Sequence, residues 1–445
     1  MDICVDITAP SRGLRRSVTP WQEALRIPCH GVSFLGVRVN RNRRSFLQGL
    51  ATLAGATTAS SASAAQDSAA TPVDRAIRPS SGPAVPVVTP DVPLLPFVVD
   101  RGVKVFTLRA EPVKTQFVPG RSVDAWGFNG SIPGPTIEVT EGDRVRIVVE
   151  NGLPEVFTPH WHGLEVPLEM DGVPGISQPP IQPGGSFTYE FTLRQNGSFF
   201  YHSHMAMQEM MGMIGFFVVH PRVAHQPRVD RDFGLIMQEW AILPYNTVPN
   251  TLAMEFNWLT FNGKAGPATT PLVVKRGERV RIRLVNLGMD HHPIHLHGNQ
   301  FYVTGTEAGR AGGPFTMAEN TVLVGVGQAR DVEFVAKYTG DWMMHCHLPH
   351  HMMNQMVSMV GPMMVPTNGA AAAAGDPSKV PGFPQDMWVP ADELAGDKPE
   401  LHGLPENWSG SMMGMMTLVR VVEPDVFEEI ERQRAERRAA VEANR

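Results

Sequence analysis

Apolar and polar residues alternate along much of the chain from about residue 103 onward. Runs such as 103–108 (V-K-V-F-T-L) and 144–150 (R-V-R-I-V-V-E) are typical of strands with one buried face. Turn signals such as Pro-Gly and Asn-Gly separate the runs, and no long amphipathic helical pattern precedes the tail. The sequence therefore predicts an all-β protein built from sandwich domains.

The chain contains an internal repeat, which predicts two similar domains. The first copy contains Phe128-Asn129-Gly130, 141–147 (E-G-D-R-V-R-I), Asn151 and His160-Trp161-His162-Gly163. The second copy contains Phe261-Asn262-Gly263, 276–282 (R-G-E-R-V-R-I), Asn286 and His295-Leu296-His297-Gly298. The offset is 133 residues at the first element and 135 at the others, and each copy closes with a second H-x-H pair.

The repeat and the composition together set the predicted boundaries. We expect domain 1 at 97–225 and domain 2 at 230–367, preceded by a Pro/Ala-rich linker at 66–96. A Pro- and Met-rich tail at 368–445 follows a run of alanines. It includes a strand-like T-L-V-R-V-V run and ends in a charged helix-like segment, from Glu423 to Asn444.

Residues 1–65 have the features of a twin-arginine export signal. Arg43-Arg44 precedes a mildly apolar run, and Ala62-Ser63-Ala64 fits an A-x-A cleavage site. Removing residues 1–64 takes away eight arginines and three acids, so the net charge changes from −6 to −11. We expect a periplasmic or secreted protein that does not bind nucleic acid, and no run downstream is long and apolar enough to span a bilayer.

Cysteine and histidine usage indicates metal binding. Cys346 is the only cysteine after the export signal, because Cys4 and Cys29 lie within it, and an internal disulfide is therefore excluded for the mature chain. His345 and His347 flank Cys346, and on a strand both imidazoles would point away from the thiol. A lone thiolate with imidazoles and a thioether nearby is the ligand set of a blue-copper site. One strand could thus serve two metal centres.

Four H-x-H motifs form the rest of the pattern: His160/His162, His202/His204, His295/His297 and His345/His347. Each pair on a strand directs two imidazoles to one side. A single pair is weak evidence for a metal site, but four pairs in register with an internal repeat are a specific pattern.

The motifs H-W-H-G, H-S-H, H-P-I-H-L-H-G and H-C-H-L-P-H-H-M-M-N-Q-M resemble the copper signatures of multicopper oxidases, over about residues 100–365. This resemblance implies four coppers per chain. The type 1 copper would be bound by His292, Cys346 and His351, with Met356 as weak axial ligand. The type 2 copper would be bound by His160 and His295. The type 3 pair would be bound by His162, His202, His204, His297, His345 and His347.

Only 87 residues separate His204 from His292, so a third domain does not fit between them. Ser203 stands where a type 1 cysteine would be needed in domain 1. The chain thus resembles the two-domain, small-laccase type, with two cupredoxin-like Greek-key sandwiches and type 1 copper in domain 2. That resemblance implies a homotrimer, with each three-copper cluster between domain 1 of one subunit and domain 2 of the next.

The implied activity is oxidation of a small reductant, coupled to reduction of O2 to water. Asp171 holds the place of a proton-delivering acid, although an ordinary Asp-Gly turn is an equally good interpretation. Methionine clusters near 205–213, 352–364 and 412–416 favour Cu(I) as the reductant and a role in copper tolerance, because thioethers prefer soft ions. They are also compatible with simple packing.

Three other functions are considered. A laccase acting on phenols or aryl amines would share every copper ligand. A periplasmic copper-storage protein without oxidase turnover would explain the methionines, but not Cys346 between two histidines. A copper nitrite reductase is rejected, because it needs fewer histidines.

Overall fold

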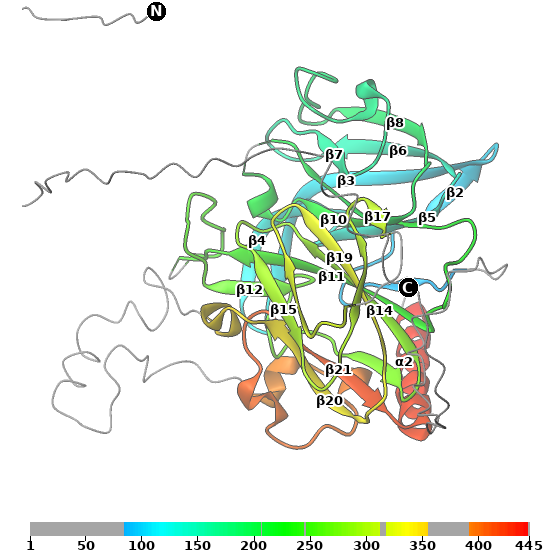
Figure 1. The fold of residues 1–445 in the computed structure, drawn as a ribbon. Helices are drawn as coiled ribbons and strands as arrows, with labels where there is room; N and C mark the ends of the chain where they lie inside the picture. Colours follow the sequence, from blue (N-terminus) through cyan, green and yellow to red (C-terminus); the bar gives the residue numbers. More distant parts are fainter. Residues whose placement is uncertain (1–83, 206, 244–245, 312–316, 355–390, 444–445) are drawn as a thin grey trace, which may run out of the picture. The chain divides into compact units, whose positions relative to one another are not determined.

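Strands make up most of the regular secondary structure in the computed structural model, which describes residues 84–205, 207–243, 246–311, 317–354 and 391–443 (Figure 1). These residues all belong to one compact unit, Ala69–Arg445. Over these ranges the one α-helix is α2, Pro424–Ala443, and the other helical segments are short 3-10 turns. The prediction of an all-β protein is confirmed. No helix within these ranges has the length and apolarity needed to cross a membrane.

Domain 1 is a sandwich of two sheets. Sheet 1A has the strand order β2-β3-β6-β8 with β4 paired to β3, and sheet 1B has the order β5-β10-β9-β7. The strands of sheet 1A are β2 (Phe97–Asp100), β3 (Val103–Gln116), β4 (Ser122–Phe128), β6 (Arg144–Asn151) and β8 (Ser186–Thr192). Those of sheet 1B are β5 (Gly134–Thr140), β7 (Pro159–His162), β9 (Gly197–Ser203) and β10 (Ile214–His220). Alternate residues of both sheets, such as Ile147 and Phe199, meet in one apolar core.

Domain 2 repeats this arrangement. Sheet 2A has the order β1-β11-β14-β19-β16-β17 with β12 paired to β11, and sheet 2B has the order β13-β21-β20-β15-β18. The strands of sheet 2A are β1 (Val87–Val88), β11 (Arg231–Trp240), β12 (Trp258–Phe261), β14 (Arg279–Asn286), β16 (Tyr302–Thr306), β17 (Gly309–Arg310) and β19 (Gln328–Val335). Those of sheet 2B are β13 (Leu272–Lys275), β15 (His292–Leu296), β18 (Thr321–Val324), β20 (Gly340–Cys346) and β21 (Met416–Val422).

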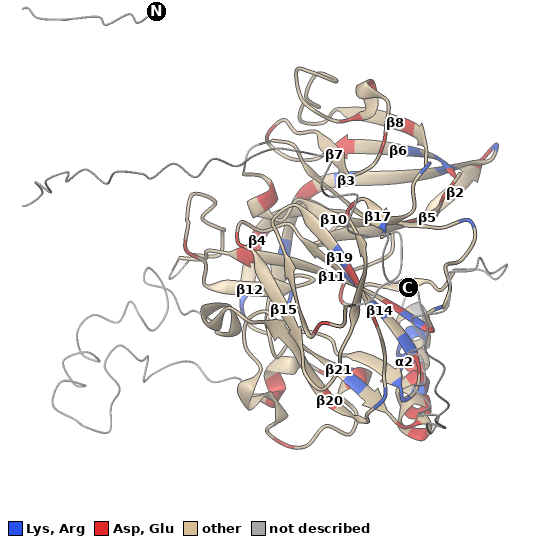
Figure 2. Cartoon of the chain, in the orientation of Figure 1, with Lys and Arg blue, Asp and Glu red and all other residues tan. Residues whose placement is uncertain are grey.

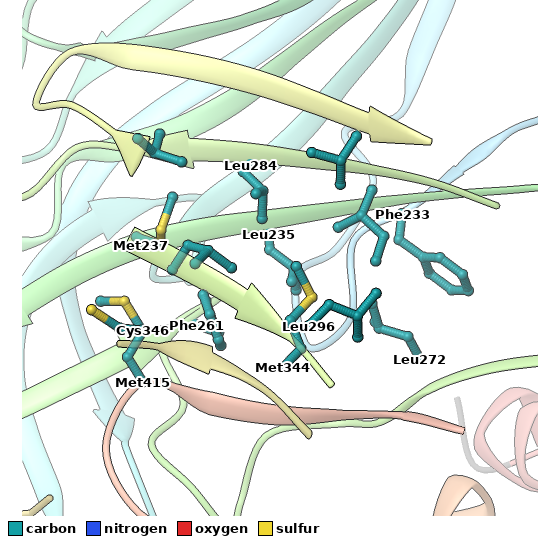
Figure 3. Packing of buried hydrophobic residues seen from close by; sticks show 14 of the residues in the cluster. Phe233, Leu235, Met237, Phe261, Leu272, Leu284, Leu296, Met344, Cys346 and Met415 are labelled. Carbon is teal, nitrogen blue, oxygen red and sulfur yellow. The ribbon is translucent and has the colours of Figure 1, made fainter. Parts of the chain in front are cut away.

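The core of domain 2 lies between sheets 2A and 2B. It contains Leu235 and Leu284 from sheet 2A and Leu296, Met344 and Cys346 from sheet 2B (Figure 3). The other face of sheet 2A packs against sheet 1B through a separate apolar cluster. That cluster joins residues such as Phe216 of β10 to Ile236 of β11 and Val285 of β14. Sheets 1B, 2A and 2B are therefore successive layers.

The structure adds two strands to the predicted domain 2, one from earlier in the sequence and one from later. Strand β21 pairs in parallel with β13 and antiparallel with β20, so it is an inner strand of sheet 2B rather than part of a separate tail. Strand β1 comes from the predicted linker and pairs with β11. Both differences have one physical reason: strand pairing joins segments far apart in the sequence, and a local pattern of residues does not record the partner.

Three arginines of β14 are buried, although an alternating strand predicts an exposed polar face. The guanidinium of Arg281 contacts Asp232 of β11 at 3.2 Å and Glu333 of β19 at 2.9 Å. Arg283 Nη1 donates a hydrogen bond of 2.8 Å to Ser198 Oγ in β9 of domain 1. The polar face of β14 is buried because domain 1 covers it.

Helix α2 carries acidic and basic side chains along its length (Figure 2). Its first two turns nevertheless bury Phe427 and Ile430 against Val273 of β13 and Val422 of β21. The helix therefore covers one end of sheet 2B with an apolar contact, and its charged residues form ion pairs such as Arg434–Glu400.

Candidate metal centres

Three buried side chains meet at one end of the core of domain 2. His292 begins β15, Cys346 ends β20, and His351 lies in the 3-10 turn η3 (Pro349–Met352). Cys346 Sγ lies 3.6 Å from His292 Nδ1 and 3.5 Å from His351 Nδ1, and the two nitrogens are 3.2 Å apart. The centre of such a triangle is about 2 Å from each atom, a distance typical of bonds from a first-row metal ion to nitrogen. The residues therefore fit a single copper ion.

The thiol in this group needs a cation to ionise. Burial raises the pKa of Cys346 to about 12. A metal ion at the centre of the triangle would displace the proton and stabilise the thiolate.

A buried carboxylate contacts the ring nitrogen of His292 that points away from Cys346. Glu239 Oε1 of β11 lies 2.5 Å from His292 Nε2, and both side chains are fully buried. Glu239 also accepts hydrogen bonds from the backbone N–H groups of Met289 at 2.9 Å and Asp290 at 3.1 Å. A Cβ at Gly288 would lie 1.6 Å from Glu239 Oε2, so this glycine makes room for the carboxylate. The contact places the proton on Nε2 and leaves Nδ1 free to bind a metal.

The opposite side of β15 and β20 carries four histidines. His295, His297, His345 and His347 have neighbouring ring centroids 4.9 to 5.6 Å apart. The Nε2 atoms of His297 and His345 are 3.0 Å apart. His295 Nδ1 lies 2.7 Å from the Asn320 carbonyl oxygen, which can only accept, so Nδ1 carries the proton and Nε2 is free. A cavity of about 490 Å³ opens beside His295.

Domain 1 carries a matching set on β7 and at the end of β9. His160 lies 5.4 to 5.7 Å, between ring centroids, from His162, His202 and His204. His202 and His345 occupy equivalent positions in the two domains, and their Nδ1 atoms have equivalent partners. His202 Nδ1 lies 3.0 Å from the Ser203 carbonyl oxygen, and His345 Nδ1 lies 2.8 Å from the Cys346 carbonyl oxygen. Burial and the neighbouring His202 and His160 lower the pKa of His162 to about 4, which keeps its ring neutral and able to bind a metal.

Asp171 lies beside this set. Its backbone carbonyl oxygen is 2.8 Å from His160 Nδ1 and its carboxylate Oδ1 is 3.5 Å from the same atom. Gly172 follows with φ +86°, and a Cβ there would lie 1.7 Å from the Pro159 carbonyl oxygen. The Asp-Gly turn therefore brings Asp171 close to β7, so the residue is both a turn residue and a neighbour of His160.

The two sets of histidines lie on different layers of the chain. His202 alternates on β9 with Tyr201 and Ser203, and shares the face of Phe200, which packs against sheet 2A. His295 and His345 alternate with Ile294 and Met344, which face the core of domain 2. Sheet 2A and that core lie between the two faces. Within the described part of the chain, sheet 2A and the core of domain 2 therefore separate the two sets, and the faces that carry them do not meet.

The structure thus brings together eleven of the twelve predicted metal ligands in three groups. The twelfth, Met356, lies outside the described residues. Several residues that contact these histidines were not predicted: Glu209, at 2.7 Å from His202 Nδ1; Asp290, at 3.5 Å from His351 Nε2; and Glu239 and Asn320. None stands in a motif, so only the fold reveals them.

Comparison with known proteins identifies the class. Models of the multicopper oxidase family match residues 110–224 and 243–362. Among solved structures, the multicopper oxidase mgLAC has a TM-score of 0.51 and 33% identity, with 56% of this chain and 81% of that chain covered. The blue copper oxidase from Nitrosomonas europaea has a TM-score of 0.52 and 28% identity, with 70% and 98% covered. The chain belongs to the multicopper oxidase family, and its two domains are cupredoxin-like.

Curated relatives match more locally. The chain is 34% identical over 145 residues to copper resistance protein A of Pseudomonas syringae pv. tomato. The aligned residues make up 33% of this chain and 24% of that relative. It is 32% identical over 245 residues to laccase-2 of Botryotinia fuckeliana. The aligned residues make up 50% of this chain and 41% of that laccase. The chain therefore spans less than half the length of these two relatives.

Proposed function

We propose that this protein is an oxidase that couples one-electron oxidation of a reductant to four-electron reduction of O2 to water. One type 1, one type 2 and two type 3 coppers per chain would supply the redox chemistry. The observation that carries the proposal is the orientation of three consecutive residues. Cys346 points into the triangle with His292 and His351, whereas His345 and His347 point to the other side of sheet 2B.

The strand itself would connect the two centres. Cys346 and His345 are adjacent, and His345 Nδ1 lies 2.8 Å from the Cys346 carbonyl oxygen, so a covalent and a hydrogen-bonded route run side by side. Both residues lie on β20, which pairs with β15 and β21 and is therefore held on both edges. This rigid connection would keep the two ligand sets at a fixed separation.

Asp171 is proposed to deliver protons. Dioxygen reduction to water consumes protons, and the Asp171 side chain is partly exposed while lying 3.5 Å from His160 Nδ1. We expect Asp171→Asn to slow O2 reduction without changing copper content, since the amide still fits the turn but cannot transfer a proton.

We further propose that the three-copper cluster forms between subunits of a homotrimer. The two histidine sets lie on different layers of one chain, so each needs a partner from elsewhere. The set on domain 2 occupies the outer face of sheet 2B, where a neighbouring domain 1 can reach it. A head-to-tail ring of three chains would pair each domain 1 set with the domain 2 set of the next subunit.

Subunit mixing tests this arrangement. One variant carries His160→Ala and His202→Ala, and the other carries His295→Ala and His345→Ala. Unfolding and refolding the two together should restore part of the oxidase activity, because some interfaces combine two intact sets. Activity that never exceeds that of the separate variants would contradict a cluster shared between subunits.

Copper analysis and oxygen uptake test the oxidase proposal itself. We expect four coppers per chain, a blue absorption band, and O2 consumption with a reductant. Cys346→Ser should remove the blue band while the three-copper cluster still fills. Copper binding without O2 consumption by any reductant would favour the storage protein instead.

Cu(I) is the proposed reductant, with phenols or aryl amines as the second candidate class. Half-buried Met343 and Met352 lie in a cluster with Met412, Met416 and Trp408, near His351. A relative named copper resistance protein A supports a role in copper tolerance, whereas the laccase relative supports phenols. Oxygen uptake with Cu(I), a phenol and Mn(II) in competition distinguishes these reductants.

The location is proposed to be the periplasm or the exterior of the cell. The proposal rests on the twin-arginine pattern at Arg43-Arg44, which lies outside the described residues. Replacing both arginines with lysine should trap the protein in the cytoplasm, as judged by cell fractionation.

A further inference from the structure

The predicted tail contains one further element of the internal repeat. Residues 209–214 read E-M-M-G-M-I, and residues 411–416 read S-M-M-G-M-M, displaced by 202 positions. Strands β10 (Ile214–His220) and β21 (Met416–Val422) begin and end at equivalent positions of these two segments. The M-M-G-M motif therefore immediately precedes the same strand in both domains.

The pairing of these strands confirms their equivalence. Strand β10 runs parallel to β5 and antiparallel to β9, with Ile214 opposite His202. Strand β21 runs parallel to β13 and antiparallel to β20, with Met416 opposite His345. His202 and His345 are themselves equivalent histidines, so the two sheets share the same register.

The equivalent of Met213 in domain 2 is thus Met415. The Ser203 N–H donates a hydrogen bond to the Met213 carbonyl at 3.0 Å in domain 1. The Cys346 N–H donates to the Met415 carbonyl at 3.0 Å in domain 2. Ser203 takes the place of a type 1 cysteine in domain 1. In domain 2 the equivalent position holds Cys346, and Met415 is its hydrogen-bonded neighbour.

The side chain of Met415 lies with the thiol. Met415 is fully buried, belongs to the same core cluster as Cys346, and lies next to it at one end of that cluster (Figure 3). Its backbone N–H also donates a hydrogen bond of 3.0 Å to the His351 carbonyl. Met415 therefore contacts both the strand that carries Cys346 and the turn that carries His351.

Two neighbours fix this contact. Gly414 has φ +63°, and a Cβ there would lie 2.1 Å from the His351 carbonyl oxygen, so no other residue fits without moving the turn. Buried Asn354 accepts a hydrogen bond from the Gly414 N–H at 2.9 Å and donates one to the Gly266 carbonyl at 3.1 Å. These contacts hold the M-M-G-M segment against the loop that follows His351.

We propose that Met415, rather than Met356, supplies the weak fourth ligand of the type 1 site. The inference rests on the proposed oxidase function, because it assumes copper at the triangle of Cys346, His292 and His351. A thioether is a soft donor suited to this weak axial position. In domain 1 the methionine motif starts at Met210, six positions after His204. In domain 2 the equivalent motif starts at Met412, and residues 348–411 separate it from His347. The segment 348–411 is thus much longer than the equivalent connection in domain 1, and the proposed ligand lies after it. A prediction from spacing along the sequence selects Met356 instead, because it lies only five residues after His351.

The experiment compares single variants of the full-length, copper-loaded protein. Met415→Leu conserves volume and removes the sulfur. We expect it to raise the reduction potential of the type 1 copper and to change the relative intensities of its visible bands, with the same copper content. Met415→Gln should instead lower the potential and alter the copper hyperfine splitting in the electron paramagnetic resonance spectrum, because an amide oxygen is a harder ligand.

Met413→Leu is the matched control, because it alters the same motif at a half-buried residue outside the core cluster. It should leave the potential and the spectrum unchanged. The rival assignment is tested by Met356→Leu, which decides the question even if the Met415 variants fail to fold. An unchanged potential in Met356→Leu supports the proposal, and a shifted potential overturns it. A wild-type protein that has the blue band but consumes no O2 with any reductant would instead contradict the oxidase function and leave the ligand assignment standing, whereas a copper-loaded protein without the blue band would overturn both.

Discussion

At the scale of single residues, carboxylates behind the histidines decide which ring nitrogen faces a metal. Glu239 contacts His292 Nε2 and Glu209 contacts His202 Nδ1. The two contacts occur at different ring nitrogens, so His292 presents Nδ1 to its centre and His202 presents Nε2. Partners of this kind fix the tautomer and raise the basicity of the ligand.

Glu239→Gln should weaken copper binding at the type 1 site by roughly 10- to 100-fold, because the neutral amide supports the His292 ligand less well than a carboxylate. Copper titration of the apoprotein, followed by the blue band, measures this effect. Glu209→Gln is the matched control: it should lower occupancy at the other centre and leave the blue band intact. Equal loss of the blue band in both variants would contradict separate roles for the two carboxylates.

At the scale of strands, local patterns predict which side chains share a face but not which strands are neighbours. The alternation of His345, Cys346 and His347 predicts a thiol and two imidazoles on opposite faces, and the structure has them so. The same reasoning does not place Glu239, because its partner His292 lies on another sheet. It also does not identify Thr417–Val422 as an inner strand, since a T-L-V-R-V-V run looks the same at an edge or in the centre of a sheet.

Truncation should separate the contributions of β21 and α2. A chain ending at Glu423 loses the helix and its contacts through Phe427 and Ile430, which we expect to cost about 3–5 kcal/mol of stability while leaving the blue site intact. A chain ending at Ser411 loses Met415 and β21, and domain 2 should not fold. Thermal unfolding and the blue band report both effects. A folded, blue protein ending at Ser411 would contradict the role of β21.

At the scale of the whole molecule, a buried charged network joins the two domains. Burial alone would raise the pKa of Glu333, but the guanidiniums of Arg281 and Arg310 outweigh it and hold the pKa well below its usual range. Ser198 of domain 1 enters the same network, through hydrogen bonds to Arg283 and to Asp331 at 2.8 and 2.5 Å. Removing one partner of such a network leaves an uncompensated buried charge, which costs about 3–5 kcal/mol.

The low pKa of Glu333 predicts loss of stability in acid. Its ionised form stabilises the fold fully above the pKa of the unfolded chain, for which the usual value is 4.5, and this contribution is lost as the pH falls below it. Thermal unfolding of the apoprotein between pH 7 and pH 3 should therefore show a falling midpoint. Glu333→Gln should be less stable at pH 7 and show a shallower decline. Parallel curves for the two proteins would mean that other carboxylates control the acid response.

The long separation in sequence between Cys346 and β21 has a consequence for biosynthesis. Domain 1 is complete once β10 ends at His220, so it can fold while the ribosome is still translating the second half. The sheet around Cys346 cannot close until Val422 has emerged, long after the cysteine itself. We therefore expect the proposed copper site at Cys346 to form only after β21 has been translated. A ribosome stalled between these two points would hold a folded domain 1 and a thiol still open to oxidation.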